Sequence, residues 1–214
     1  MKYELIENSM NDINRLMKTV LTNRGITNIE EFMNSGKEDL EQNSFSDLNN
    51  IEAGVEILIK HIKENNMISL VVDPDVDGIC SSAILYNYLE NLTAQEDLPP
   101  IKWDIVTHSG KGHGFSKDIE INPQTKLIIT PDGGSNDFEE HKKWKNLGVD
   151  ILVIDHHVVE KESEDAIVIN NQTSENYKNK AFSGVGVVYR FLQALDDEFF
   201  TFEGGLSFLP MALR

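Results

Sequence analysis

The sequence predicts a doubly wound α/β domain with a mostly parallel sheet, preceded by a helical N-terminal cap. From residue 67 onward, short apolar runs rich in β-branched residues alternate with stretches of helical periodicity. This alternation is typical of parallel strands that are covered by helices on both faces. The segment before residue 67 shows helical patterns instead. We therefore expect a cap over residues 1–66 and an α/β domain over residues 67–214.

The individual elements follow from hydrophobic periodicity and from glycine and polar breaks. The expected strands cover residues 68–72, 101–106, 127–130, 151–154 and 166–169. Helical patterns of the same domain cover residues 81–92, 138–147 and 185–195. In the cap, helices are expected at residues 8–24, 28–33 and 50–65, with a polar loop at 34–47.

The composition is that of a globular protein with an unusual charge. The 214 residues suffice for one domain with a small appendage, and the formal net charge is -17. Such a charge disfavours broad electrostatic binding of nucleic acid, which needs clustered Lys and Arg. Bound metal cations or a local groove can offset this repulsion. We expect most of the acidic side chains to lie on a solvated surface.

The sequence also restricts the compartment. Cys80 is the only cysteine, so an intrachain disulfide is impossible and a reducing cytoplasm fits. No apolar run approaches the roughly 18 residues that a membrane span needs, and the first residues do not resemble a signal peptide. We expect a cytoplasmic protein with no membrane partner.

Three of the expected strands end in acidic or histidine-rich segments. These segments are Asp73-Pro74-Asp75-Val76-Asp77-Gly78, Thr130-Pro131-Asp132-Gly133-Gly134 and Asp155-His156-His157. The carboxyl ends of parallel strands lie along one edge of a sheet, where ligands bind. Carboxylate oxygen and imidazole nitrogen suit Mn²⁺, Mg²⁺ or Zn²⁺. Because clustered carboxylates repel one another unless cations hold them, a metal cluster is the expected outcome.

Other interpretations apply to single motifs. An Asp at a strand end often caps the next helix, and for Asp77 or Asp132 taken alone capping is the better interpretation. The run from Asp73 to Gly78 also matches the opening of a calcium-binding EF-hand loop. That match fails because the twelfth position is Ile84 instead of Glu and because a strand precedes the loop.

In order, these motifs resemble the motif set of the DHH phosphoesterases. Further segments resemble the RecJ branch of single-strand exonucleases: Asn23–Ile26, Gly112–Ser116 with His113 in place of a Tyr, Asn170–Gln172 without the usual Pro, and Phe182–Val188. The pairing of Asp-x-Asp-x-Asp-Gly with Asp-His-His is the specific part of this resemblance. It covers essentially the whole chain.

The resemblance implies a role for each matching residue. Asp75, Asp77, Asp132 and His156 would bind metal, with Asp132 bridging two ions of Mn²⁺ or Mg²⁺. His157 would contact the scissile phosphate or a metal ligand, while Asp73 and Asp155 would orient neighbouring groups.

Two loops are candidates for contact with the substrate. Gly184 and Gly186 belong to a loop in which the missing side chains leave room either for a phosphate or for close backbone packing. His108, Lys111 and His113 are candidates for phosphate contact, and the alternative is a solvent-exposed loop.

The implied activity is two-metal hydrolysis of single-stranded DNA from the 5′ end, in DNA repair and recombination. Alternatives are a DHH hydrolase of short oligonucleotides or cyclic dinucleotides, and a non-catalytic scaffold. The family's next motif and its second domain are expected beyond Ala212-Leu213, where Arg214 replaces the family's glycine. The alternatives are a fragment, a truncated chain, a degenerate copy and one half of a split enzyme whose second chain supplies these parts. We expect little or no nuclease activity from this chain by itself. Asp196 or Asp197 are possible substitutes for the absent ligand.

Overall fold

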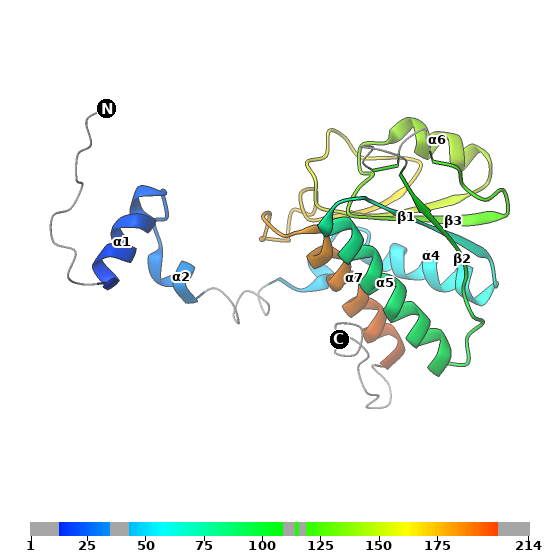
Figure 1. Ribbon diagram of the computed structural model, residues 1–214, viewed down its shortest axis with the longest axis horizontal. Helices are drawn as coiled ribbons and strands as arrows, with labels where there is room; N and C mark the ends of the chain where they lie inside the picture. Colours follow the sequence, from blue (N-terminus) through cyan, green and yellow to red (C-terminus); the bar gives the residue numbers. More distant parts are fainter. Residues whose placement is uncertain (1–12, 35–42, 109–113, 116–118, 201–214) are drawn as a thin grey trace. The chain divides into compact units, whose positions relative to one another are not determined.

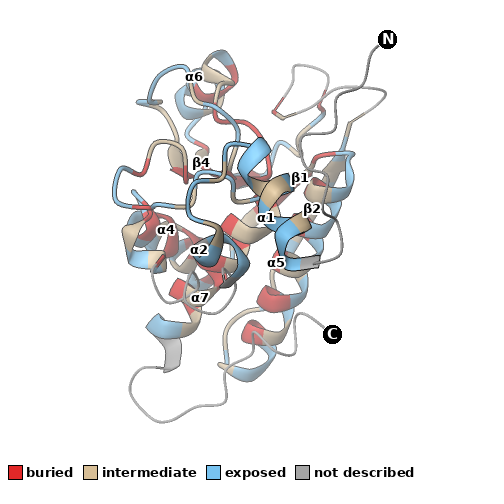
Figure 2. Cartoon of the chain, turned by 90° about the vertical axis from the view of Figure 1, so that its left-hand side faces the viewer, coloured by how far each residue is buried: buried red, intermediate tan, exposed pale blue. Residues whose placement is uncertain are grey.

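A computed structural model describes residues 13–34, 43–108, 114–115 and 119–200. Contacts divide the chain into two units, residues 1–42 and residues 43–214. In the first unit, helix α1 (Ile13–Asn23) contacts helix α2 (Ile29–Asn34). Gly25 lies between them with a φ of 78°, a conformation that glycine adopts without strain. None of the residues in this unit whose burial is described is buried (Figure 2).

The second unit is built on five parallel strands. They are β1 (Met67–Val72), β2 (Lys102–Thr107), β3 (Thr125–Pro131), β4 (Asp150–Asp155) and β5 (Ile167–Asn170), in the order β2-β1-β3-β4-β5. Each expected strand is present, with ends that differ by one or two residues. The predicted α/β fold with a parallel sheet is confirmed.

The strand order has a functional consequence. The chain starts at β1, adds β2 on one side and then builds β3, β4 and β5 on the other. Loops leaving β1 and β3 at their carboxyl ends therefore diverge, and ligands of doubly wound sheets bind at this switch point.

Helices cover both faces of the sheet (Figure 1). Helices α4 (Ile51–Lys63), α5 (Val76–Gln95) and α7 (Gly184–Phe200) lie on one face, and α6 (Phe138–Asn146) lies on the other. A short 3₁₀ helix, η1 (Phe45–Asp47), precedes α4. The larger core fills the three-helix side, and a smaller one around Phe115 and Ile128 fills the α6 side.

Helix α4 was expected in the N-terminal cap, but its contacts are with the sheet and with α7. A Cβ atom on Gly54 would lie 2.6 Å from Cδ1 of Ile169 and 3.1 Å from Cδ1 of Leu152, so the helix backbone approaches the sheet closely there. The apolar face of α4, which includes Val55 and Leu58, is buried in the larger core. Because α4 packs against the sheet, the boundary between the two units falls near residue 42. We propose this boundary in place of residue 66.

Helix α5 begins five residues before the expected start. Asp75 is its N-cap, and the Asp75 side chain accepts a hydrogen bond of 2.9 Å from the Gly78 backbone N–H. This cap satisfies one of the free N–H groups of the first turn. Hydrophobic periodicity alone misses this first turn, because Asp77 and Gly78 break the apolar pattern.

Among the helices that the structure describes, none combines the length and apolar character needed to cross a bilayer.

Candidate metal centre

The three acidic segments meet at the carboxyl edge of the sheet, as expected from the sequence. They follow β1, β3 and β4, which are neighbours in the sheet. A pocket at this edge is lined by residues of all three segments and by the loop around Gly114: Asp73, Asp75, Gly114, Asp132, Gly133, Gly134, Ser135, Asn136, Asp137, Asp155, His157 and Val158. None of these lining residues is Lys or Arg.

Asp132 lies at the centre of this cluster. Its side chain is 1% exposed, its φ is 64°, and neither carboxylate oxygen has a hydrogen-bond partner among the described residues. Burial, and then the nearby Asp77 and Asp75 carboxylates, raise the pKa of Asp132 to about 8. A buried carboxylate without donors is costly, and a cation would satisfy it.

The His156 ring directs its Nε2 atom toward the Asp132 carboxylate. Its Nδ1 lies 3.0 Å from the carbonyl oxygen of Phe182. Since a carbonyl only accepts, Nδ1 carries the proton and, in the neutral ring, Nε2 has a free lone pair. Nε2 lies 3.2 Å from Oδ1 of Asp132 and 3.8 Å from Oδ2 of Asp77. Metal-bound histidines characteristically donate their second N–H to such an acceptor.

Two groups of possible ligands share Asp132. Ligand atoms of Asp132, His156 and His157 lie within 4.8 Å of one another, and so do those of Asp73, Asp75 and Asp132. A carboxylate common to two groups is the arrangement that a pair of bridged ions requires. The donor set therefore fits two divalent cations.

Asp77 has a second partner that the sequence did not reveal. Its carboxylate accepts hydrogen bonds from the backbone N–H groups of Gly184, at 2.9 Å, and Val185, at 2.8 Å. It thus holds the N-terminus of α7 against the first turn of α5. A residue expected to bind metal also joins two helices, so its removal would affect both folding and metal binding.

Asp155 holds the two histidines in place. Its buried carboxylate accepts hydrogen bonds from the backbone N–H groups of His156 and Ser135 and from Nδ1 of His157, the last at 2.8 Å. Burial alone would raise the pKa of Asp155, but the hydrogen bonds from His157 and Ser135 lower it to about 2. The same contact with Asp155 raises the pKa of His157 to about 9, against the opposing effect of burial. Without a bound cation, His157 is therefore positively charged at neutral pH.

Asp73 anchors the loop that follows β2. Its Oδ1 accepts a hydrogen bond of 2.8 Å from the Gly114 backbone N–H. The next residue, Phe115, donates its backbone N–H to Asp137 and buries its ring in the smaller core. One wall of the metal centre is thus fixed at two consecutive residues.

The two candidate glycines lie against protein atoms. A Cβ atom on Gly184 would lie 1.9 Å from Oδ1 of Asp132, and one on Gly186 would lie 2.8 Å from the Phe182 ring. Of the two roles considered for this loop, close packing is what the structure shows. Gly184 leaves room for the Asp132 carboxylate, so it is needed by the metal centre itself.

The remaining candidates lie elsewhere. Lys111 and His113 fall outside the described residues, while His108 is half-buried just after β2. Asp196 accepts a hydrogen bond of 3.3 Å from Tyr88, and Asp197 is exposed. Both lie near the C-terminal end of α7, about 18 Å along the helix from Gly184, so neither reaches the metal centre.

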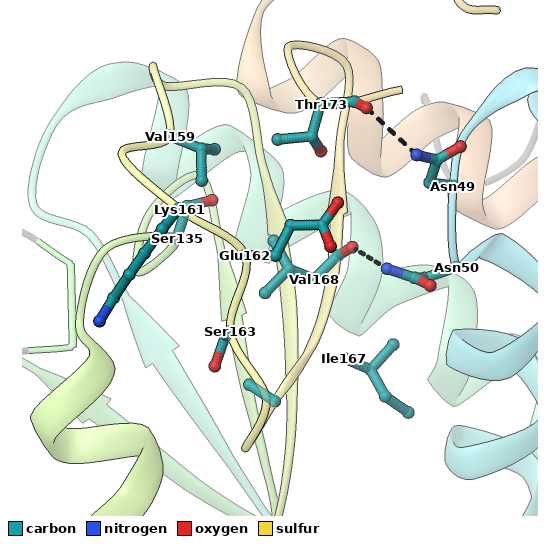
Figure 3. A pocket seen from close by; sticks show the side chains of 11 residues that line it. Asn49, Asn50, Ser135, Val159, Lys161, Glu162, Ser163, Ile167, Val168 and Thr173 are labelled. Carbon is teal, nitrogen blue, oxygen red and sulfur yellow. Dashed lines mark hydrogen bonds between the residues drawn. The ribbon is translucent and has the colours of Figure 1, made fainter. Parts of the chain in front are cut away.

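A second pocket lies beside the edge strand β5 (Figure 3). Asn50 donates to the Val168 carbonyl at 2.8 Å, and Asn49 donates to that of Thr173 at 3.1 Å. The ionisable side chains that line it are Lys161 and Glu162. Because it lacks a carboxylate cluster, this pocket does not compete with the metal centre.

Sequence reasoning missed the residues that act through the backbone. The Phe182 carbonyl and the Ser135 N–H orient His156 and Asp155, but backbone groups carry no sequence signal of their own. Asp137 could have been noticed as an N-cap of α6, yet its carboxylate is used by the Phe115 N–H instead.

Fold and site together define a class of protein, a doubly wound α/β domain with a cluster of acidic and histidine side chains at its switch point that could hold metal. The N-terminal domain of the DHH family matches residues 65–207. The chain belongs to the DHH family.

Curated relatives of the chain carry the names of exonucleases. The putative SPbeta prophage-derived single-strand DNA-specific exonuclease YorK of Bacillus subtilis strain 168 is 41% identical over 199 residues, which cover 92% of this chain and 33% of the relative. The single-stranded-DNA-specific exonuclease RecJ of Escherichia coli strain K12 is 26% identical over 185 residues, 84% of this chain and 31% of the relative. The chain thus spans about a third of the length of these relatives.

Among solved structures, exonuclease RecJ bound to manganese superposes with a TM-score of 0.61 at 21% identity, covering 72% of this chain and 39% of the other. The similarity supports the fold. The resemblance to RecJ seen in the sequence motifs is confirmed by these relatives.

Proposed function

We propose that this chain forms the metal-binding catalytic part of a single-strand-specific exonuclease that hydrolyses phosphodiester bonds. The observation that carries the proposal is the sharing of Asp132 by two groups of ligands. The names of the relatives support single-stranded DNA as the substrate. The manganese bound by the RecJ structure supports Mn²⁺, with Mg²⁺ as the alternative ion.

Each site residue then has a chemical task. Asp73, Asp75, Asp77, Asp132 and His156 would hold two ions, which would supply hydroxide at neutral pH and stabilise the leaving oxygen. His157, held by Asp155, would contact the phosphate with its exposed ring. A 5′ to 3′ direction, a cytoplasmic location and a role in DNA repair or recombination belong to the same proposal. So does a second chain that supplies further domains.

The test compares two matched aspartates. We expect the full chain with Mn²⁺ to release at most small amounts of mononucleotide from labelled single-stranded DNA, and Asp132→Asn to lose this residual activity. Asp150→Asn, at the opposite end of the sheet, serves as the control and should keep it. A single-strand assay labelled at either end gives the direction of cleavage.

A binding measurement makes the outcome decisive even if turnover is slow. Titration calorimetry should detect Mn²⁺ binding to the native chain and to Asp150→Asn, but not to Asp132→Asn. Equal Mn²⁺ affinity in all three proteins, or cleavage of duplex as fast as single strand, would contradict the proposal.

A further inference from the structure

Apolar side chains remain exposed on one side of α5, beginning at the carboxyl edge of the sheet. Val76 is 79% exposed and Ile79 is 52% exposed. Cys80 and Ala83 are exposed as well. Their spacing of three, four and seven residues from Val76 places all four on one face of the helix. The helix thus carries an uncharged stripe that starts between two aspartates of the metal centre.

The edge strand β2 extends this stripe. The Trp103 ring packs against Tyr86 of α5, with ring centroids 5.4 Å apart. Because side chains alternate along a strand, Ile105 lies on the same face of the sheet as Trp103, one step nearer the carboxyl edge. Ile105 is 54% exposed. Residues Val76, Ile79, Cys80, Ala83 and Ile105 are called the edge patch.

The charge around the metal centre limits how a nucleic acid can be held there. The chain carries a net charge of -17, and the described residues that line the centre include no Lys or Arg. Bound cations neutralise one phosphate, but counterion release from many Lys and Arg contacts is not available at this wall. On the described surface, uncharged contacts are therefore the available source of further affinity for a strand.

We propose that the edge patch binds the unpaired nucleobases of the strand whose phosphate lies in the metal centre. This inference rests on the proposed function and adds to it the way in which single strands are selected. Ile79 lies four residues after Asp75, about 6 Å along the helix axis, within reach of a base next to the bound phosphate. Aliphatic side chains contact the face of any base and read no hydrogen-bonding edge, so the contact tolerates any sequence. Paired and stacked bases of a duplex do not offer these faces.

The only cysteine of the chain provides a probe within the patch. We would measure the alkylation rate of Cys80 in the full chain with Mn²⁺ and two phosphorothioate oligomers of equal length. One is oligothymidine, and the other carries abasic sugars. Saturating oligothymidine should slow alkylation at least about fivefold, as base contacts of roughly 1 kcal/mol or more would require. The abasic oligomer should leave the rate unchanged.

Variants of the patch give a second readout. The double variant Ile79→Ser with Ile105→Ser should bind oligothymidine at least about fivefold more weakly while its Mn²⁺ affinity and its affinity for the abasic oligomer stay unchanged. Leu147→Ser is the matched control, because Leu147 is 63% exposed at the end of α6 on the other face of the sheet.

The outcomes separate this inference from the proposed function. Oligothymidine that binds without protecting Cys80, or an abasic oligomer that protects it equally, would overturn the edge patch as a base-binding surface. Protection that grows with protein concentration alone would assign the patch to a second copy of the chain and also overturn it. Failure of both oligomers to bind would refute the proposed function, and the inference with it.

Discussion

The two ends of the sheet each hold a close aspartate–histidine pair. The two histidine rings use opposite nitrogens as hydrogen-bond donors. At the amino end of β4, Nε2 of His61 lies 3.0 Å from Oδ2 of Asp150, and Nδ1 of His61 lies 3.0 Å from the amide nitrogen of Asn66. Since that amide nitrogen can only donate, Nε2 of His61 carries the proton and donates it to Asp150. At the carboxyl end, His156 uses Nδ1 as the donor, so in the neutral ring Nε2 faces Asp132 without a proton.

The charges around the two aspartates also differ: Asp150 has a lysine beside it, and Asp132 has other carboxylates. Lys145 also donates to Asp150, at 3.1 Å. Burial would raise the pKa of Asp150, but the hydrogen bonds from His61 and Lys145 lower it. Asp132 instead has carboxylates as neighbours, and its pKa is raised. One pair completes its interactions within the protein, whereas at the other pair the Asp132 carboxylate has no hydrogen-bond partner among the described residues and is available to the cation that we propose. This contrast teaches that the tautomer of a histidine, chosen by its second partner, distinguishes a structural pair from a metal site.

The largest expected effect comes from removing the charge of Asp132. Asp132→Asn should weaken Mn²⁺ binding by more than about 100-fold, because loss of a shared ligand exceeds the 10- to 100-fold cost of losing a supporting partner. Calorimetry measures it, and unchanged affinity would break the contrast between the two ends.

The same variant should stabilise the protein when metal is removed by a chelator. In the unfolded chain this carboxyl ionises near pH 4, but in the folded protein only near pH 8. The folded state therefore binds the extra proton between these values, and native stability falls as pH rises through that window. Asparagine removes this loss, so the gain should be on the order of a few kcal/mol at pH 9 and small at pH 4. Urea unfolding at pH 9 and pH 4 provides the measurement. An equal gain in stability at both pH values would show that burial and the neighbouring carboxylates do not disfavour the charged form of Asp132.

Gly184→Ala tests whether close packing shapes the metal centre. The new methyl group would lie 1.9 Å from Oδ1 of Asp132, so α7 or the carboxylate must move. We expect a loss of about 1–3 kcal/mol of stability together with weaker Mn²⁺ binding. The comparison variant is Gly54→Ala, which crowds Ile169 in the core and should lower stability alone. An unchanged Mn²⁺ affinity in Gly184→Ala would show that metal binding does not depend on the exact position of the Asp132 carboxylate.

Asp150→Asn should lower stability by about 1 kcal/mol at pH 7 and leave Mn²⁺ affinity unchanged, since the variant weakens the hydrogen bond from the His61 ring and the exposed one from Lys145. The lowered pKa makes this contribution present above the unfolded value and lost as pH falls through the folded value. Native and variant stabilities should therefore converge in acid. A difference that persists in acid, after Asp150 has become protonated in the folded state, would point to packing instead of charge.

The smallest effect concerns His141, which is fully buried beside Phe115 and Phe138. Burial lowers the pKa of His141, so below about pH 6.5 the unfolded state takes up the proton first and stability falls. His141→Gln should have a flatter stability profile between pH 7 and pH 5, measured by urea unfolding. Parallel profiles for both proteins would contradict the assignment.

Much of the fold was predictable because periodicity reports directly on burial. The apolar runs of β1, β3 and β4 and the spacing in α4 identified these elements, and parallel pairing followed from their alternation with helices. The start of α5 was misplaced, since Asp77 and Gly78 in its first turn interrupt the apolar pattern. Helix α4 was assigned to the cap, because periodicity shows that a helix has a buried face and does not show what that face contacts.

The sequence by itself determined which side chains gather at the metal centre, because the carboxyl ends of parallel strands share one edge. Only the tertiary structure decided how they are connected. Asp77 holds the start of α7, Gly184 makes room for Asp132, and the Phe182 carbonyl sets the tautomer of His156. These contacts join residues far apart in the chain and pass through backbone groups, which every residue possesses, so no pattern of residue types could announce them.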